Sequence, residues 1–121
     1  SRNWCRTVLE WNLAADPNQD PHTEGGCTQC LGALTLDGNK VTRNVAYYII
    51  GHASKFVQPG AVRIGSTLPE GWPNVAFRNP DGSKVAIVLN DASAQRTFNL
   101  RHAGHKWVIT LPAGGVGTFI W

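Results

Sequence analysis

Hydrophobic positions in the first half of the chain fall into runs separated by one long polar stretch. Residues 7–14, TVLEWNLA, form an apolar run without clean alternation. That pattern is typical of a parallel strand covered on both faces. Residues 15–32 are rich in Asp, Asn, Pro and Gly and predict a long loop, and loops of this length are usually functional or poorly ordered. A short strand at 33–36, closed by the Asp37-Gly38 turn, is expected next.

The following stretch, TRNVAYYIIGHASKFV, has the spacing of an amphipathic helix. Thr42 is a suitable N-cap, and Gln58-Pro59-Gly60 ends the helix. The apolar positions recur at i, i+3, i+4, i+7, i+8 and i+11. They are Val45, Tyr48, Ile49, His52, Ala53 and Phe56. We expect this stripe to face a core and His52 to be a core histidine.

From residue 61 onward the pattern changes to short alternating strands joined by tight turns. NVAFR and SKVAIVLN flank the hairpin turn NPDG, and QRTFNL, HKWVITL and VGTFIW follow with Gly-containing turns between them. Several short antiparallel strands of this kind predict a β-sandwich or a small barrel. The chain therefore divides at Pro59-Gly60. Residues 1–58 read as strand, loop and helix of an α/β protein, and residues 59–121 as an all-β domain.

Length and composition limit what this chain can be. A mass of 13.1 kDa for 121 residues allows a modest core, whereas a complete (β/α)₈ barrel needs about 250 residues. The net charge is +3, and no basic cluster exceeds two neighbouring residues. We therefore expect no nucleic-acid partner. The longest helical apolar stretch contains Gly, His, Ser and Lys, so we expect no membrane span. Because the first residue is not Met, we expect a piece of a longer protein.

Three cysteines leave several readings open. Cys27 and Cys30 form a C-x-x-C within EGGCTQCLG, and Cys5 stands apart. The pair fits a local disulfide, two reduced thiols or half of a zinc site. A zinc site needs four ligands, and His22 is a third ligand at most, with His52 or Cys5 as a distant fourth. We treat Cys27 and Cys30 as a disulfide candidate, expect no metal and no cofactor, and note that a disulfide implies an oxidising compartment.

Five stretches carry a family resemblance over nearly the whole chain: NWCRTVLEWNLAADPNQDPH, GGCTQCLGALTLDG, TRNVAYYIIGHASKFVQPGAVRIGS, VAFRNPDGSKVAIVLND and LPAGGVGTFIW. They resemble the C-terminal part of family-30 glycoside hydrolases, the glucosylceramidase and β-1,6-glucanase-like group. The resemblance implies a (β/α)₈ barrel with an attached β-sandwich. Thr7–Ala14 would be the eighth barrel strand, residues 15–41 the loop over the active-site face, Asn44–Val57 the last barrel helix, and Ala61–Trp121 most of the sandwich.

The same resemblance implies a retaining hydrolase whose two catalytic glutamates lie on the fourth and seventh barrel strands. Both matching segments would precede Ser1, so we expect no catalytic residue in this chain and no activity from it alone. Its partners would be a β-glucan or a glucosylated substrate and the missing N-terminal part of the same protein. We expect a secreted, extracellular protein. The alternative is a non-catalytic carbohydrate-binding β-sandwich module.

Five residues are candidates for substrate binding. The resemblance implies that Trp11 stacks on a sugar, with a barrel-core aromatic as the plain alternative. Glu10 would be a polar, hydrogen-bonding group at the barrel mouth. Asn12 would bond within the loop or cap a strand end, and His22 would lie in a loop facing the substrate cleft. Trp72, in PEGWPN, is the best exposed aromatic candidate on the sandwich. We expect Trp107 and Trp121 to pack in the core or at a sheet edge.

Overall fold

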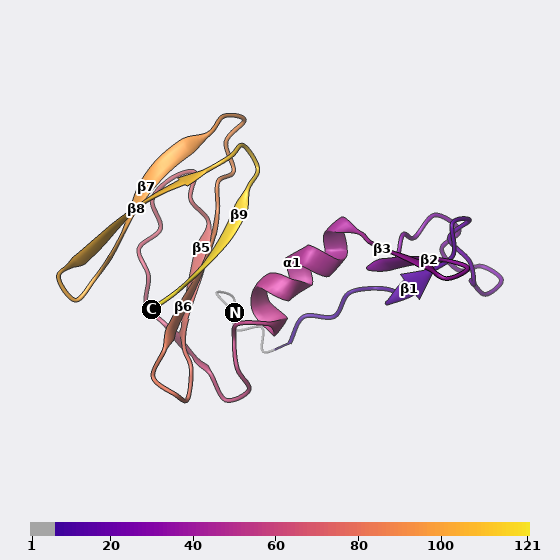
Figure 1. The fold of residues 1–121 in the computed structure, drawn as a ribbon, viewed down its shortest axis with the longest axis horizontal. Coiled ribbons are helices and arrows are strands. Elements are labelled where there is room, and N and C mark those ends of the chain that lie inside the picture. The colour runs from indigo at the N-terminus through magenta and orange to yellow at the C-terminus, as the bar shows by residue number, and fades with distance from the viewer. Residues whose placement is uncertain (1–6) are drawn as a thin grey trace. The chain divides into compact units, whose positions relative to one another are not determined.

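A computed structural model describes residues 7–121, which form two compact units (Figure 1). One unit ends at Ser54, and the other comprises Lys55–Trp121. Within the described residues the chain has nine strands and one helix, and all but one of the strand pairs are antiparallel. The mainly-β fold class predicted from the sequence is confirmed.

The first unit is a small mixed sheet followed by the helix. Strands β1 (Ala14–Ala15), β2 (Leu34–Asp37) and β3 (Lys40–Arg43) lie in the order β1-β2-β3. β1 pairs with β2 in parallel, and β2 pairs with β3 in an antiparallel hairpin. Gly38 turns this hairpin with a φ of 55°, which glycine adopts at little cost. Helix α1 (Val45–Ser54) follows at once.

The two ends of the long loop are fixed by close contacts beside this sheet. Asn44, just before α1, donates through Nδ2 to the carbonyl oxygen of Gly32 at 2.8 Å and to Thr35 Oγ1 at 2.9 Å. A Cβ at Gly32 would lie 2.9 Å from Ala14 Cα, so only glycine allows the loop to pass this close to β1. The loop between β1 and β2 is therefore held at both of its ends by the small sheet.

The strand expected over residues 7–14 is wrong in its extent. Only Ala14 of that run is in a strand, and residues 7–13 belong to no strand or helix. A strand needs hydrogen-bonding neighbours along its edges. Among residues 7–121 the run finds backbone partners only at its end, where Asn12 O accepts from Ala33 N at 3.2 Å, Leu13 O accepts from Leu34 N at 2.9 Å and Ala14 pairs with β2. An apolar run reveals a preference for burial but not which segment supplies the partner.

The helix is shorter and more exposed than expected. Thr42 lies in β3 and is not the N-cap, and the residue immediately before α1 is Asn44. None of the helix residues is buried, and Val45 and Ile49 are 73% and 55% exposed. His52 is half-buried, so the expectation of a core histidine is also wrong. The half-buried helix residues are Ala46, Ile50, Gly51 and His52, so among the described residues most of the predicted stripe does not face a core.

The second unit contains two antiparallel sheets. The first sheet has the order β4-β5-β6-β9, and the second is the β7-β8 hairpin. Their strands are β4 (Val62–Ile64), β5 (Asn74–Arg78), β6 (Lys84–Leu89), β7 (Arg96–His102), β8 (His105–Leu111) and β9 (Val116–Ile120). The predicted turn NPDG joins β5 to β6, with Gly82 at a φ of 87°. The predicted turn at residues 102–104 joins β7 to β8.

The core of the second unit lies between these sheets. Its buried apolar members are Trp72, Ala76, Ala86, Val88 and Leu111. Phe98 of β7 packs on them, with its ring centroid 4.7 Å from that of Trp72 and 5.8 Å from that of Phe119. Side chains from both sheets therefore share one core, which confirms the predicted β-sandwich.

The turn between β5 and β6 carries a carboxylate with a shifted pKa. Asp81 accepts hydrogen bonds from Ser83 Oγ at 2.6 Å, Ser83 N at 2.9 Å and Gln58 Nε2 at 2.8 Å. The Ser83 hydroxyl, followed by the Ser83 amide and Gln58, holds the pKa of Asp81 below its ordinary value. A carboxylate with a lowered folded-state pKa stabilises the fold above its unfolded pKa, near 3.9, and this contribution disappears as pH falls.

We therefore expect Asp81→Asn to destabilise the chain at pH 7 and to have a shrinking effect as the pH falls from about 5 to 2. Thermal unfolding of both proteins across this range measures the difference. Ser83→Ala removes the hydroxyl donor and should reduce the pH dependence of stability between about pH 5 and pH 2. A wild-type-minus-variant difference that stays constant from pH 7 to pH 2 contradicts the assignment.

Candidate functional site

A cavity of about 420 Å³ in the first unit brings together most of the residues singled out from the sequence. Its wall comes entirely from the segment 11–30 and consists of Trp11, Asn12, Gln19, Pro21, His22, Thr23, Gly26, Cys27 and Cys30. The cavity is within the size range of small-ligand sites. Among the described residues its lining combines an indole ring, amide side chains, an imidazole and two sulfurs, and contains no carboxylate.

Trp11 and Asn12 form one wall next to β1. The Trp11 side chain is 76% exposed, which leaves its flat apolar ring available to a ligand. Asn12 has a φ of 69°, a conformation that Asn tolerates better than most residues. Its Oδ1 accepts a hydrogen bond from Ala14 N at 3.1 Å, and so Asn12 caps the start of β1, the plainer of the two roles expected for it. Glu10 is exposed and does not line the cavity.

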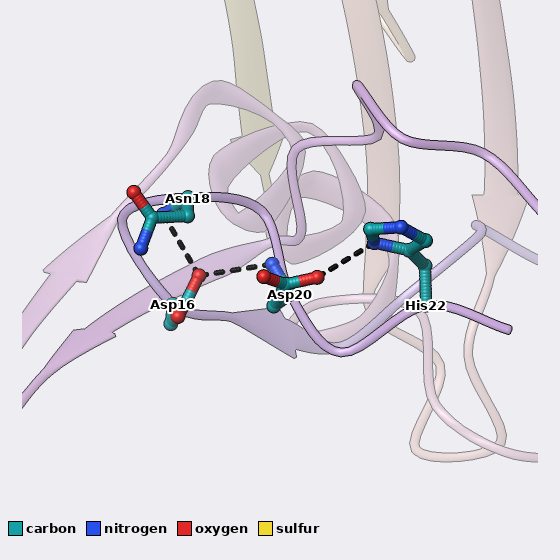
Figure 2. Close-up of polar contacts among 4 residues, drawn as sticks. All are labelled: Asp16, Asn18, Asp20 and His22. Carbon is teal, nitrogen blue, oxygen red and sulfur yellow. Dashed lines mark hydrogen bonds and ion pairs between the residues drawn. The ribbon is translucent and has the colours of Figure 1, made fainter.

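Asp16 organises the turn that leads from β1 into the loop (Figure 2). Its Oδ1 accepts from Asn18 N at 2.8 Å and from Asp20 N at 2.9 Å. The Asp16 backbone N–H donates to Asp20 O at 2.8 Å, and Gln19 N donates to Asp16 O at 3.0 Å. An Asp side chain that bonds the backbone ahead of it is a common turn device. Four bonds therefore close residues 16–20 into a compact turn.

His22 follows this turn and pairs with Asp20. His22 Nδ1 lies 2.7 Å from Asp20 Oδ1, and Figure 2 shows the imidazole directed toward that carboxylate. Sequence reasoning selected His22 but missed Asp16 and Asp20. Both are acids in a polar loop, where composition alone gives no sign of which backbone groups they will bind.

A disulfide is part of the cavity wall. Cys27 and Cys30 are joined with an S–S distance of 2.03 Å, which removes both sulfurs as ligands for zinc. Before them, Gly26 N donates to Thr23 O at 2.8 Å. A Cβ at Gly26 would also lie 2.8 Å from that oxygen, so the turn requires glycine. Cys5 lies outside the described residues. Within residues 7–121 no three His, Cys, Asp or Glu side chains are grouped to hold a metal ion.

Gln19 is a further cavity residue that the sequence does not reveal. Its Oε1 is buried and has no hydrogen-bond partner, and its backbone φ is 67°. A buried amide oxygen without a donor is uncommon, because losing water without replacement costs about 1–3 kcal/mol. A neutral amide in a loop rich in Asp, Asn and Pro carries no sequence signal of this kind.

Trp72 is not the exposed aromatic expected from its position in a turn sequence. It is 6% exposed and sits in the sandwich core. The Arg96 guanidinium lies 5.0 Å from the centre of its ring, a cation–π contact. The surrounding Pro and Gly residues indicate a turn correctly, but the indole folds back between the sheets, where its large apolar area is buried. Trp107 is 38% exposed on β8, and its ring lies 6.0 Å from that of Trp121.

Comparison with known proteins assigns the chain to a family. Residues 60–119 match the model of the "Glycosyl hydrolase family 30 beta sandwich domain". These residues include β4 to β8 and all but the last residue of β9. The chain belongs to glycoside hydrolase family 30. The resemblance stated from the sequence is thereby confirmed.

Two curated relatives and one solved structure show which family-30 enzymes the chain is similar to. Endo-1,6-β-D-glucanase neg1 of Aspergillus fumigatus is 32% identical over 98% of this chain and 26% of the relative. Lysosomal acid glucosylceramidase of Mus musculus is 26% identical over 93% of this chain and 22% of the relative. In the solved structure of the endo-β1,6-glucanase BT3312, the match covers 99% of this chain and 28% of the BT3312 chain, with a TM-score of 0.88 and 33% sequence identity.

These matches also show how little of each relative the family-30 chain covers. It spans about a quarter of the length of the curated relatives it matches. Of the described residues, no helix has both the length and the apolar character needed to cross a membrane.

Proposed function

We propose that this chain is the C-terminal portion of a secreted, retaining glycoside hydrolase that acts on β-glucosidic bonds. The observation that carries the proposal is the cavity of residues 11–30 in a chain similar to endo-1,6-β-glucanases and a glucosylceramidase. In this proposal the chain supplies part of the substrate-binding wall, and the catalytic glutamates come from the part of the protein that precedes it.

The exposed apolar side chains of the first unit support a missing partner. Val8, Leu9 and Leu13 are 77%, 93% and 76% exposed, and they belong to a segment outside any strand. Soluble proteins rarely leave apolar residues in such density uncovered unless they bind another surface. We propose that residues 7–14 complete a (β/α)₈ barrel as its last strand, and that α1 is its last helix, once the N-terminal part is present.

The chemistry of the cavity suits a neutral sugar. The apolar face of a glucose ring packs on the indole of Trp11, while polar side chains such as His22 and Asn12 bond its hydroxyl groups. Sugar and drug-like sites commonly combine an aromatic wall with a few placed polar groups. We assign Glu10 to the rim of the complete site, where it would bond a hydroxyl or a neighbouring loop. Trp72 is left out of this assignment because its ring is in the sandwich core.

Secretion is supported by the bond between Cys27 and Cys30. Disulfides persist in oxidising compartments and are rare where thiols are kept reduced. The bridge forms part of the cavity wall, so an extracellular protein would keep this wall intact.

The test is hydrolysis of β-1,6-glucan and of glucosylceramide by the full-length protein that carries this chain. We expect turnover of at least one of them, with the β-configured product first seen by NMR, as retention requires. We expect Trp11→Ala to lower kcat/KM by about 30-fold, because truncating an aromatic anchor costs about 2 kcal/mol. The matched control, Trp107→Ala on β8, should stay within about twofold.

Two outcomes would overturn the proposal. Equal kcat/KM for Trp11→Ala and the wild type would remove Trp11 from the site. Binding of glucan without hydrolysis of any β-glucoside by the full-length protein would replace the enzyme with a carbohydrate-binding module.

A further inference from the structure

We propose that Asp20 is a positioning residue that holds His22 in one tautomer. The carboxylate keeps the proton on His22 Nδ1, and Nε2 then accepts a hydrogen bond from a hydroxyl group of the carbohydrate. The ligand class rests on the proposed function, whereas the tautomer rests on the geometry of this chain alone.

The tautomer follows from the short contact between the two side chains. His22 Nδ1 is 2.7 Å from Asp20 Oδ1, well within hydrogen-bond distance. An ionised carboxylate can only accept hydrogen bonds, so the proton between the two atoms belongs to Nδ1. In a neutral imidazole the other nitrogen is then an acceptor, and the partner of one nitrogen decides the role of the other.

The two residues occupy different places with respect to the cavity. His22 lines it, whereas Asp20 does not. The His22 side chain is 35% exposed and that of Asp20 is 51% exposed. Asp20 therefore does not contact the ligand itself and affects binding only by orienting the His22 imidazole. Carboxylates orient metal-binding histidines in the same way.

The backbone holds the carboxylate in place. Asp16 binds the Asp20 backbone twice, since its Oδ1 accepts from Asp20 N at 2.9 Å and its own N–H donates to Asp20 O at 2.8 Å. Between Asp20 and His22 stands Pro21, whose ring restricts φ to a narrow range. Asp20 and His22 are therefore presented to each other by a turn with few remaining torsional freedoms (Figure 2).

An acceptor at Nε2 selects among sugars. A neutral glucose unit offers hydroxyl donors on every side, whereas an ionised carboxylate or phosphate offers none. Beside the apolar ring of Trp11 and the disulfide, such an acceptor favours a hydroxyl group over a carboxylate or a phosphate at the sugar position that faces it. The pair Asp20–His22 is thus a device for recognising uncharged sugar hydroxyl groups.

The tautomer can be read directly from the isolated chain. A long-range ¹H–¹⁵N spectrum of the labelled chain at pH 8.5, where protein imidazoles are ordinarily neutral, distinguishes the protonated nitrogen of each ring. His22→Gln assigns the signal. We expect a protonated Nδ1 in the wild type and a shift toward protonated Nε2 in Asp20→Ala. A wild-type His22 protonated at Nε2, or a spectrum unchanged by Asp20→Ala, overturns the proposal.

Kinetics of the full-length protein test the contact with the ligand. Asp20→Ala and His22→Ala should each raise KM for β-1,6-glucan about fivefold with little change in kcat, and the double variant should be no worse than either single one. Glu24→Ala, an exposed acid in the same loop, is the matched control. Multiplying effects in the double variant would reject the shared role. If the wild type hydrolyses no glucan, the proposed function fails while the tautomer stands or falls on the spectrum.

Discussion

The 121-residue chain, assayed alone, should hydrolyse neither β-1,6-glucan nor an aryl β-glucoside above the rate in buffer. Retaining glycosidases need two carboxyl groups about 5–5.5 Å apart, one as acid/base and one as nucleophile. The cavity that gathers Trp11 and His22 has no carboxylate in its wall. Enzymes accelerate reactions by at least about 10⁶-fold, so losing both groups removes essentially all of the rate.

Release of reducing sugar over many hours measures this expectation. The folded state of the chain is checked first by circular dichroism, so that inactivity is not mistaken for unfolding. The positive control is the full-length protein at the same molar concentration. Turnover by the chain that is clearly above buffer, and that survives repeated purification, would mean that carboxylates such as Glu10 or Glu24 perform the chemistry, and the assignment of catalysis to the missing part would be wrong.

The strands of the second unit could be predicted closely because their alternating side chains and their turn residues are recognisable in the local sequence. NVAFR coincides with β5, and SKVAIVLN extends beyond β6 by one residue at each end, with the turn NPDG between them. In three of the four strand pairs of this unit the partners are neighbours in sequence, so local turn chemistry also sets their register, whereas the pairing of β6 with β9 is long-range. Trp72 shows the limit of such reasoning, because the turn around it was recognisable but the direction of its side chain depends on Phe98, more than twenty residues later.

The first unit was predicted less well for the opposite reason. Residues 7–13 and α1 have apolar patterns that predict burial, whereas Val8, Leu9 and Val45 are exposed in the structure. The pattern indicated a preference for burial but did not give the local structure. β3 was missed because all four of its residues are exposed and show no alternation of apolar and polar side chains. In the site, Trp11 and His22 stood out by residue type. Asp16, Asp20 and Gln19 act through backbone bonds and burial, which only three-dimensional structure displays.

Asn90→Ala should destabilise the second unit more than any exposed substitution in it. Asn90 is fully buried, directly after β6. Its Nδ2 donates to Ala94 O at 2.8 Å, to Pro112 O at 2.8 Å and to Leu111 O at 3.2 Å. One amide therefore satisfies carbonyl groups from the loop before β7 and from the turn after β8, and it joins segments of both sheets.

The size of the effect follows from what alanine leaves behind. Each hydrogen bond that the side-chain amide makes contributes about 1 kcal/mol, and one of the three is buried and two are part-buried, so the free energy of unfolding should fall by about 3 kcal/mol. For a domain of this size the melting temperature then falls by about 15 °C. Asn90→Asp should be worse, because a carboxylate cannot donate and would face the same carbonyl oxygens with a charge.

Urea and thermal unfolding of the three proteins measure these differences. Asn99→Ala is the matched control, because Asn99 is exposed on β7 and substitutions at such positions change stability by about 0.5 kcal/mol at most. The backbone bond from Asn90 N to Gly115 O, at 2.9 Å, survives in every variant, so the comparison isolates the side chain. A loss below 1 kcal/mol for Asn90→Ala would show that water replaces the amide, and that the two sheets are held together by the apolar core around Trp72 and Phe98 without help from this polar bridge.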